Sequence, residues 1–134
     1  MEMKIVVDGK NALLGRLASY VAKQSLLGKE ISIVNCNEVV VSGKPKSVIG
    51  EYKEMRNKGG SSLKGPFFPK LPERIVKRTI RGMLSHRQGR GRDALKRIKC
   101  YNETPVEFEN SKMIKSGKEK DIKKIKLKDL GKEI

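Results

Sequence analysis

The sequence predicts an α/β domain: a small, mostly parallel sheet between two layers of helices, opened by a strand–helix–strand unit. Two observations support this class. Over residues 5–41, short β-branched runs alternate with a segment of helical periodicity, and the last run is unbroken, as in a buried strand. The chain has 134 residues and is 37% hydrophobic, which fits one modest core. A right-handed crossover between parallel strands then places helices against the sheet.

Hydrophobic patterning predicts the N-terminal elements. Residues 5–7 form a β-branched run that predicts a strand, and residues 31–34 and 39–41 predict two more. Asn11 is a candidate N-cap for the intervening helix, and Gly28 is placed to end it in a left-handed conformation. The apolar residues of this helix recur at helical spacing: Leu13, Leu14, Leu17, Ala18, Val21 and Ala22.

Gly15 lies inside that helix. A helical glycine costs about 1 kcal/mol relative to alanine and needs a compensating reason. We therefore expect Gly15 to mark tight packing of the helix on the sheet, so that Gly15→Leu would destabilise the fold.

Turns and a loop dominate the middle of the chain. Residues 42–46 predict a turn that presents Lys44 and Lys46, after which Ser47 is a candidate N-cap for a helix. Residues 57–72 are rich in Gly, Ser and Pro and predict an extended loop. Two adjacent phenylalanines in this loop are not counted as base contacts, because Phe beside Pro is about twice as often packed into its own core.

The segment 71–105 concentrates positive charge, with ten Lys or Arg against three acids. Pro72 and Glu73 are favourable first-turn residues and predict a helix over residues 72–85. On a helical wheel the apolar residues cover one arc, and four cations share a stripe about 100° wide on the other. These cations are Arg74, Lys77, Arg78 and Arg81. Their mutual repulsion is a small stability cost that a polyanionic partner would convert into attraction.

Residues 86–92, with the sequence His-Arg-Gln-Gly-Arg-Gly-Arg, contain no aliphatic side chain and predict a mobile basic loop. Asp93 is a candidate N-cap for a short helix that follows. Arginine suits RNA here, because its guanidinium can donate two parallel hydrogen bonds to phosphate and can stack on a base. The candidate RNA-binding residues are therefore Arg74, Lys77, Arg78, Arg81, His86, Arg87, Arg90, Arg92, Lys96 and Arg97, together with Lys44 and Lys46.

We predict a single α/β RNA-binding domain over residues 1–105 and a Lys-rich, partly ordered extension over residues 106–134. The extension contains nine Lys and six acids. Leu127, Leu130 and Ile134 predict a final amphipathic turn or two. Solvation of this tail and a second RNA contact are equal alternatives.

The overall charge points to nucleic acid. A formal charge of +16 and a pI near 10.0 are tolerated most commonly in contact with nucleic acid. The sequence has no apolar run long enough for a membrane span, and its N-terminus is too short for a signal peptide. We expect a cytoplasmic protein that has no membrane partner.

Motifs for catalysis and for cofactors are missing from the sequence. Cys36, Cys100 and His86 cannot supply four zinc ligands, and both cysteines have apolar neighbours that favour buried thiols over a disulfide or a nucleophile. Residues 89–94 match G-x-G-x-x-A but follow a helix instead of a strand, so a dinucleotide site is discounted. We expect no enzymatic activity, metal, cofactor or small-molecule substrate.

Two strings of residues resemble those of the large-subunit ribosomal protein thirteen family. The first is Leu-Gly-Arg-Leu-Ala-Ser at residues 14–19, followed by Val34-Asn35 and Ser42-Gly43. The second is Arg-Gly-Met-Leu at residues 81–84, accompanied by Gly65-Pro66, Arg78, His86, a glycine of the Gly-Arg-Gly loop, Ala94-Leu95 and residues 101–105. Ser85 stands where many relatives carry Pro, residues 59–64 differ from bacterial members, and the Lys-rich tail is similar to archaeal-type members.

The resemblance implies a three-layer α/β domain that binds large-subunit rRNA beside neighbouring ribosomal proteins and supports subunit assembly and translation without enzymatic activity. The alternative hypothesis is an independent nucleic-acid enzyme or regulator that uses the same basic face. Copurification with large ribosomal subunits separates the two.

Overall fold

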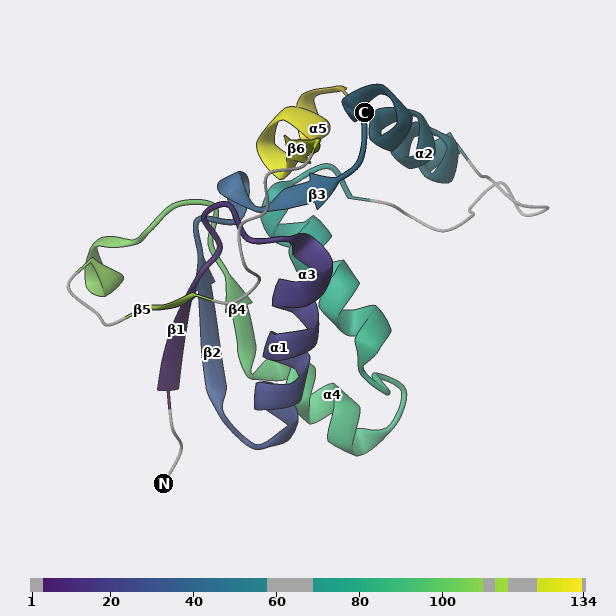
Figure 1. The fold of residues 1–134 in the computed structure, drawn as a ribbon. Helices are drawn as coiled ribbons and strands as arrows, with labels where there is room; N and C mark the ends of the chain where they lie inside the picture. The colour runs from purple at the N-terminus through teal and green to yellow at the C-terminus, as the bar shows by residue number, and fades with distance from the viewer. Residues whose placement is uncertain (1–3, 58–68, 110–112, 116–122, 134) are drawn as a thin grey trace.

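The computed structural model describes residues 4–57, 69–109, 113–115 and 123–133. Its main sheet has four strands in the order β4-β2-β1-β5, and all neighbouring strands run parallel (Figure 1). Their bounds are β1 Lys4–Asp8, β2 Glu30–Val34, β4 Ile98–Cys100 and β5 Met113–Lys115. The predicted α/β class, the mostly parallel sheet and the β1–α1–β2 opening are confirmed.

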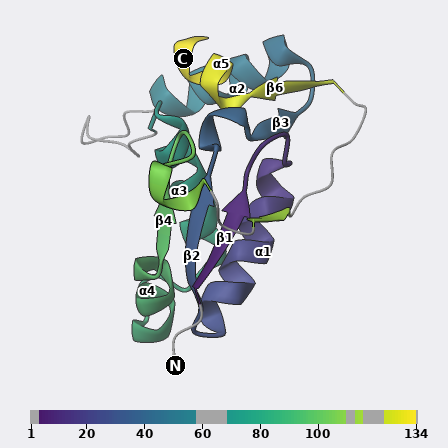
Figure 2. The same ribbon diagram turned by 90° about the vertical axis from the view of Figure 1, so that its left-hand side faces the viewer.

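Three helices lie on one face of this sheet: α1 Leu14–Leu26, α3 Pro72–Met83 and α4 Gly89–Lys96 (Figures 1 and 2). Strand residues alternate between the faces, so Val7, Ile31 and Ile33 are buried beneath the helices. On the other face, the helical element among the described residues is the short 3-10 helix η2, Val106–Phe108, so the predicted second layer of helices is reduced there to this one turn. The Phe108 ring lies 5.7 Å from that of Tyr101.

A second sheet has two strands, β3 Val40–Ser42 and β6 Lys124–Lys126, which pair antiparallel. The strand predicted over residues 39–41 is therefore present, but its expected place in the parallel sheet is wrong. β2 already has β1 and β4 as neighbours, and the chain turns away at η1, Cys36–Glu38, after Asn35 at a φ of 58°.

The C-terminal segment returns to the core. Helix α5, Leu127–Glu133, packs against η1, α3 and helix α2, Pro45–Asn57. Leu127 and Leu130 are 0% exposed, which confirms the predicted amphipathic segment at these two positions, and Ile134 lies outside the described residues. The division of the chain at residue 105 stays a prediction, whereas the described parts of the tail supply strands β5 and β6 and part of the core.

Three predicted helix starts are wrong. α1 begins at Leu14, and Asn11 instead occupies a turn with a φ of 59°. α2 begins two residues before Ser47, and α4 begins four residues before Asp93. Gly28 does have the expected positive φ, at 94°. The loop predicted between α2 and α3 lies mostly in residues 58–68, outside the described part of the chain.

The packing role predicted for Gly15 is also wrong, because Gly15 is exposed and a Cβ built on it meets nothing within 4 Å. We now expect Gly15→Ala to raise the free energy of unfolding by about 0.5–1 kcal/mol through helix propensity. Urea denaturation measures this change. Gly9→Ala is the contrasting variant, since its Cβ would lie 2.8 Å from Val39 Cγ2 and should destabilise the fold. Destabilisation by Gly15→Ala would contradict the exposed position.

Candidate nucleic-acid interface

Helix α3 has one buried and one cationic face. Ile75, Val76 and Ile80 are buried, and the helix packs mainly on α1. Arg74 and Arg81 are exposed, and Arg78 is half-buried. Together with Pro69 and Lys77, these arginines line an open groove along the helix. The predicted amphipathic helix is therefore present, ending at Met83 instead of Ser85.

Lys77 differs from the other members of the stripe. Its Nζ donates a hydrogen bond to the Leu95 carbonyl at 2.8 Å and a second to the Ile98 carbonyl. The side chain is half-buried, and this burial lowers the pKa of its amine. The expectation that Lys77 points outward as a free cation is wrong, because its ammonium joins α3 to the end of α4 and to β4.

Replacing Lys77 tests this structural role. We expect Lys77→Met to lower the free energy of unfolding by about 1–3 kcal/mol, since two carbonyl groups lose a charged donor. Urea denaturation is the measurement. Arg74→Met is the matched control, because Arg74 is exposed one turn away and its loss should leave stability nearly unchanged. Equal stability of the two variants would contradict the link.

The segment predicted as a mobile basic loop is instead a tight turn followed by a helix. The His86 N–H donates to Leu84 O at 2.8 Å, and the Gln88 N–H donates to Ser85 O at 2.9 Å. Helix α4 then begins at Gly89. A Cβ on Gly91 would overlap the Ser85 carbonyl, whereas one on Gly89 would meet nothing within 4 Å. Gly91 therefore permits α4 to pack directly on the turn.

The turn and α4 fix the positions of several predicted site residues. Arg92 Nη2 donates to the Arg87 carbonyl at 3.1 Å, and Arg97 Nη1 donates to the Ser25 carbonyl at 2.8 Å. Arg87, Arg90 and Arg92 are exposed, whereas Arg97 and His86 are half-buried. The structure thus brings together most of the predicted RNA-binding residues, along α3, the turn and α4.

Ion pairs join Lys4 with Glu30 at 3.7 Å and Lys126 with Glu38 at 3.9 Å. The arginines of α3, the turn and α4 are exposed, apart from the half-buried Arg78. They form a cationic surface, which we call the α3–α4 surface and define as Arg74, Arg78, Arg81, Arg87, Arg90 and Arg92.

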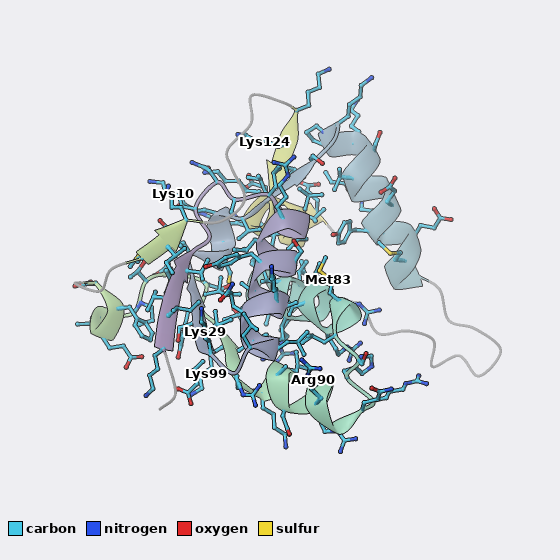
Figure 3. All side chains as sticks on the ribbon, turned by 60° about the horizontal axis from the view of Figure 1, so that its bottom comes forward. Lys10, Lys29, Met83, Arg90, Lys99 and Lys124 are labelled. Atoms are coloured by element: carbon cyan, nitrogen blue, oxygen red, sulfur yellow. The ribbon has the colours of Figure 1, made fainter. Side chains whose placement is uncertain are left out.

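Lys44 and Lys46 lie elsewhere. They are exposed at the start of α2, which lies at the opposite end of the molecule from α4 (Figure 1). Strand β6 lies beside this start, because Gly43 N donates to Lys123 O at 2.8 Å and Ser42 pairs with Lys124. Lys124 and Arg90 accordingly lie at opposite ends of Figure 3. Lys44 and Lys46 thus form a second cationic group with the lysines of residues 123–126. This grouping was not predicted, because no local pattern joins residues 42–46 to residues 123–126.

A stretch without Lys or Arg lies on a different side of the molecule. Residues 100–111 contain no Lys or Arg and include Glu103, Glu107 and Glu109. The η2 helix within this stretch lies on the sheet face away from α3 and α4 (Figure 1). The molecule is therefore polarised, with its densest positive charge on the helical side.

The part of the chain that the structure describes offers no group of three or more His, Cys, Asp or Glu able to hold a metal ion. Among the same residues, no helix has the length and apolar character needed to cross a membrane.

The fold and the α3–α4 surface define a small, strongly basic α/β protein. A family model described as Ribosomal protein L13 matches residues 2–107. This chain belongs to that family, whose members are structural proteins and not enzymes.

Curated relatives agree with this assignment, and each bears the name large ribosomal subunit protein uL13. The protein of Methanosarcina barkeri is 49% identical over 110 residues, which are 81% of this chain and 78% of the relative. The Methanococcoides burtonii protein is 44% identical over 81% of this chain and 78% of its own. The Thermoplasma volcanium protein is 39% identical over 96% of both chains. The family resemblance and its archaeal character are confirmed.

Proposed function

We propose that this protein is a structural constituent of the large ribosomal subunit in the cytoplasm, where it binds large-subunit rRNA and supports subunit assembly and translation. Family membership supports the ribosomal role. The observation that carries the rRNA contact is the α3–α4 surface, which three consecutive elements display on one side of the molecule. His86 and Lys96 border this surface, and Lys77 and Arg97 support it through their internal hydrogen bonds.

Phosphate is the part of RNA that this surface fits. Arginines dominate it, and a guanidinium can pair with phosphate through two parallel hydrogen bonds. Its segment contains one aromatic residue, Tyr101, whose ring already faces Phe108. The surface therefore has few aromatic side chains on which bases could stack. Recognition then depends on the arrangement of phosphates in folded RNA.

A second contact is proposed at the opposite end of the molecule. Lys44 and Lys46 lie beside β6, whose neighbourhood adds Lys123, Lys124 and Lys126. The two cationic groups would engage separate segments of rRNA, while the less basic side around η2 is left for neighbouring ribosomal proteins.

Salt dependence tests the rRNA contact. If roughly six phosphates are neutralised, the slope of log K against log salt on a duplex-rich large-subunit rRNA fragment should be about −4 to −5. Fluorescence anisotropy over a salt series measures it. A slope shallower than about −2 would contradict the proposal that the protein binds RNA mainly through phosphate.

Copurification tests the ribosomal role separately. We expect stoichiometric recovery of the protein with large ribosomal subunits after a low-salt wash. Recovery only as free protein or on messenger RNA would favour the alternative, a nucleic-acid regulator that uses the same surface.

A further inference from the structure

The two cysteines of the chain lie side by side although 63 residues separate them in sequence. Cys36 begins η1, and Cys100 ends β4. The pairing of β2 with β4 places Cys100 opposite Ile33, and the Cys36 N–H donates to the Tyr101 carbonyl at 3.0 Å. The Cys36 thiol donates to the Ile33 carbonyl at 3.8 Å, so it lies beside the residue that pairs with Cys100.

The two cysteines differ in their exposure to solvent. Cys36 is 0% exposed within the core, whereas Cys100 is half-buried. Cys100 also lines an open cavity of about 360 Å³ together with Glu73, Arg74, Lys77 and Lys99. A small molecule entering this cavity therefore meets the sulfur of Cys100 and not that of Cys36.

The same arrangement activates one sulfur. The neighbouring Cys36 thiol and the nearby Lys77 ammonium lower the pKa of Cys100, against the opposing effects of burial and of Glu73. The neighbouring Cys100 and burial raise the pKa of Cys36. Lys77 is held close by because its Nζ bonds the carbonyl of Ile98, two residues before Cys100.

We propose that Cys36 and Cys100 form an internal dithiol that a small anionic disulfide oxidises, with Cys100 as the nucleophile and Cys36 as the resolving thiol. The Cys100 thiolate attacks one sulfur of the small disulfide, forms a mixed disulfide and releases one small thiolate. The Cys36 sulfur, after losing its proton, then attacks the Cys100 sulfur and releases the second small thiolate. Two protein thiols are oxidised, one disulfide is reduced to two thiols, and the cysteine protons pass to the leaving thiolates.

The cavity favours an anionic reagent because three of its lining side chains are cationic: Arg74, Lys77 and Lys99. The product would link η1 covalently to β4 beneath α3. Because both cysteines belong to one folded core and Cys36 is fully buried, the link forms within one molecule and not between two.

Mass spectrometry of the intact folded protein tests the proposal, with oxidised glutathione as the probe. The parent protein should lose two hydrogen atoms, retain no glutathione and stay monomeric on a nonreducing gel. Cys36→Ala should retain one glutathione on Cys100, and Cys100→Ala should not react. A persistent glutathione adduct on the parent protein, or equal reactivity of Cys100→Ala, would overturn the assignment of roles.

A charge variant tests the activation. Lys77→Gln should slow the first step severalfold, whereas Lys23→Gln, at an exposed residue outside the cavity, should leave its rate unchanged. Melting temperatures of all variants, measured under reducing conditions, show whether each remains folded. If a variant is unfolded, the parent protein decides the question: thiols that react only in guanidinium and never in native buffer would overturn the proposal.

Discussion

Replacing four exposed arginines of the α3–α4 surface with glutamine should weaken binding to a large-subunit rRNA fragment by about a thousandfold near 0.1 M salt. This magnitude assumes that each arginine neutralises one phosphate, which contributes roughly 0.7–0.9 to the log–log salt slope. The four residues are Arg74, Arg81, Arg90 and Arg92, all exposed. The slope itself should become shallower by about 3. Titrations by fluorescence anisotropy at several salt concentrations measure both quantities.

A matched variant separates position from net charge. Exposed lysines outside the two proposed contacts give the same loss of four charges when replaced with glutamine: Lys10, Lys23, Lys53 and Lys132. We expect this second variant to bind nearly as well as the parent protein. Equal losses in the two variants would mean that total charge drives binding and that α3 and α4 have no special role.

Gly91→Ala should be among the most damaging single substitutions in the chain. Its Cβ would overlap the Ser85 carbonyl and lie 2.9 Å from the Ser85 nitrogen. Because both obstacles are backbone atoms, no side-chain rotation relieves the overlap, and α4 must move away from the turn. We expect a loss of about 3 kcal/mol in the free energy of unfolding, at the upper end of the usual range for overpacked cores.

The neighbouring glycine supplies the control for this substitution. Gly89 also lies in the first turn of α4, but a Cβ there would meet open space. Gly89→Ala should therefore match or slightly exceed the parent protein in stability, and it should bind RNA normally. Urea denaturation and rRNA titration of both variants test the contrast, and similar stabilities would show that α4 does not need the close approach at Ser85.

Local sequence patterns predicted α3 well and α4 poorly, for physical reasons. The start of α3 was predictable because Pro72 and Glu73 favour a first turn and a long apolar stripe follows. For α4, glycine and arginine content favoured a loop, whereas its helix depends on packing against Ser85. That contact joins the turn after α3 to α4, so local propensity cannot reveal it.

The same limit applies to the site. A helical wheel placed Lys77 in the stripe of α3, but the carbonyls that accept hydrogen bonds from its ammonium belong to residues 95 and 98. The location of Lys44 and Lys46 near β6 likewise depends on a pairing between strands more than 80 residues apart. The kinds of residue in the candidate site were predictable from sequence, whereas their grouping required the tertiary structure.

The burial of Leu127 and Leu130 also bears on how the protein is made. During synthesis, β1 emerges well over a hundred residues before these leucines, yet the core that η1, α3 and α5 share is incomplete without them. A nascent chain that lacks α5 therefore exposes apolar surface for as long as the ribosome takes to reach it, several seconds at about 5–20 residues per second. Folding to the native state is consequently late and dependent on long-range contacts, so the chain should rely on a chaperone or on rapid release to avoid aggregation.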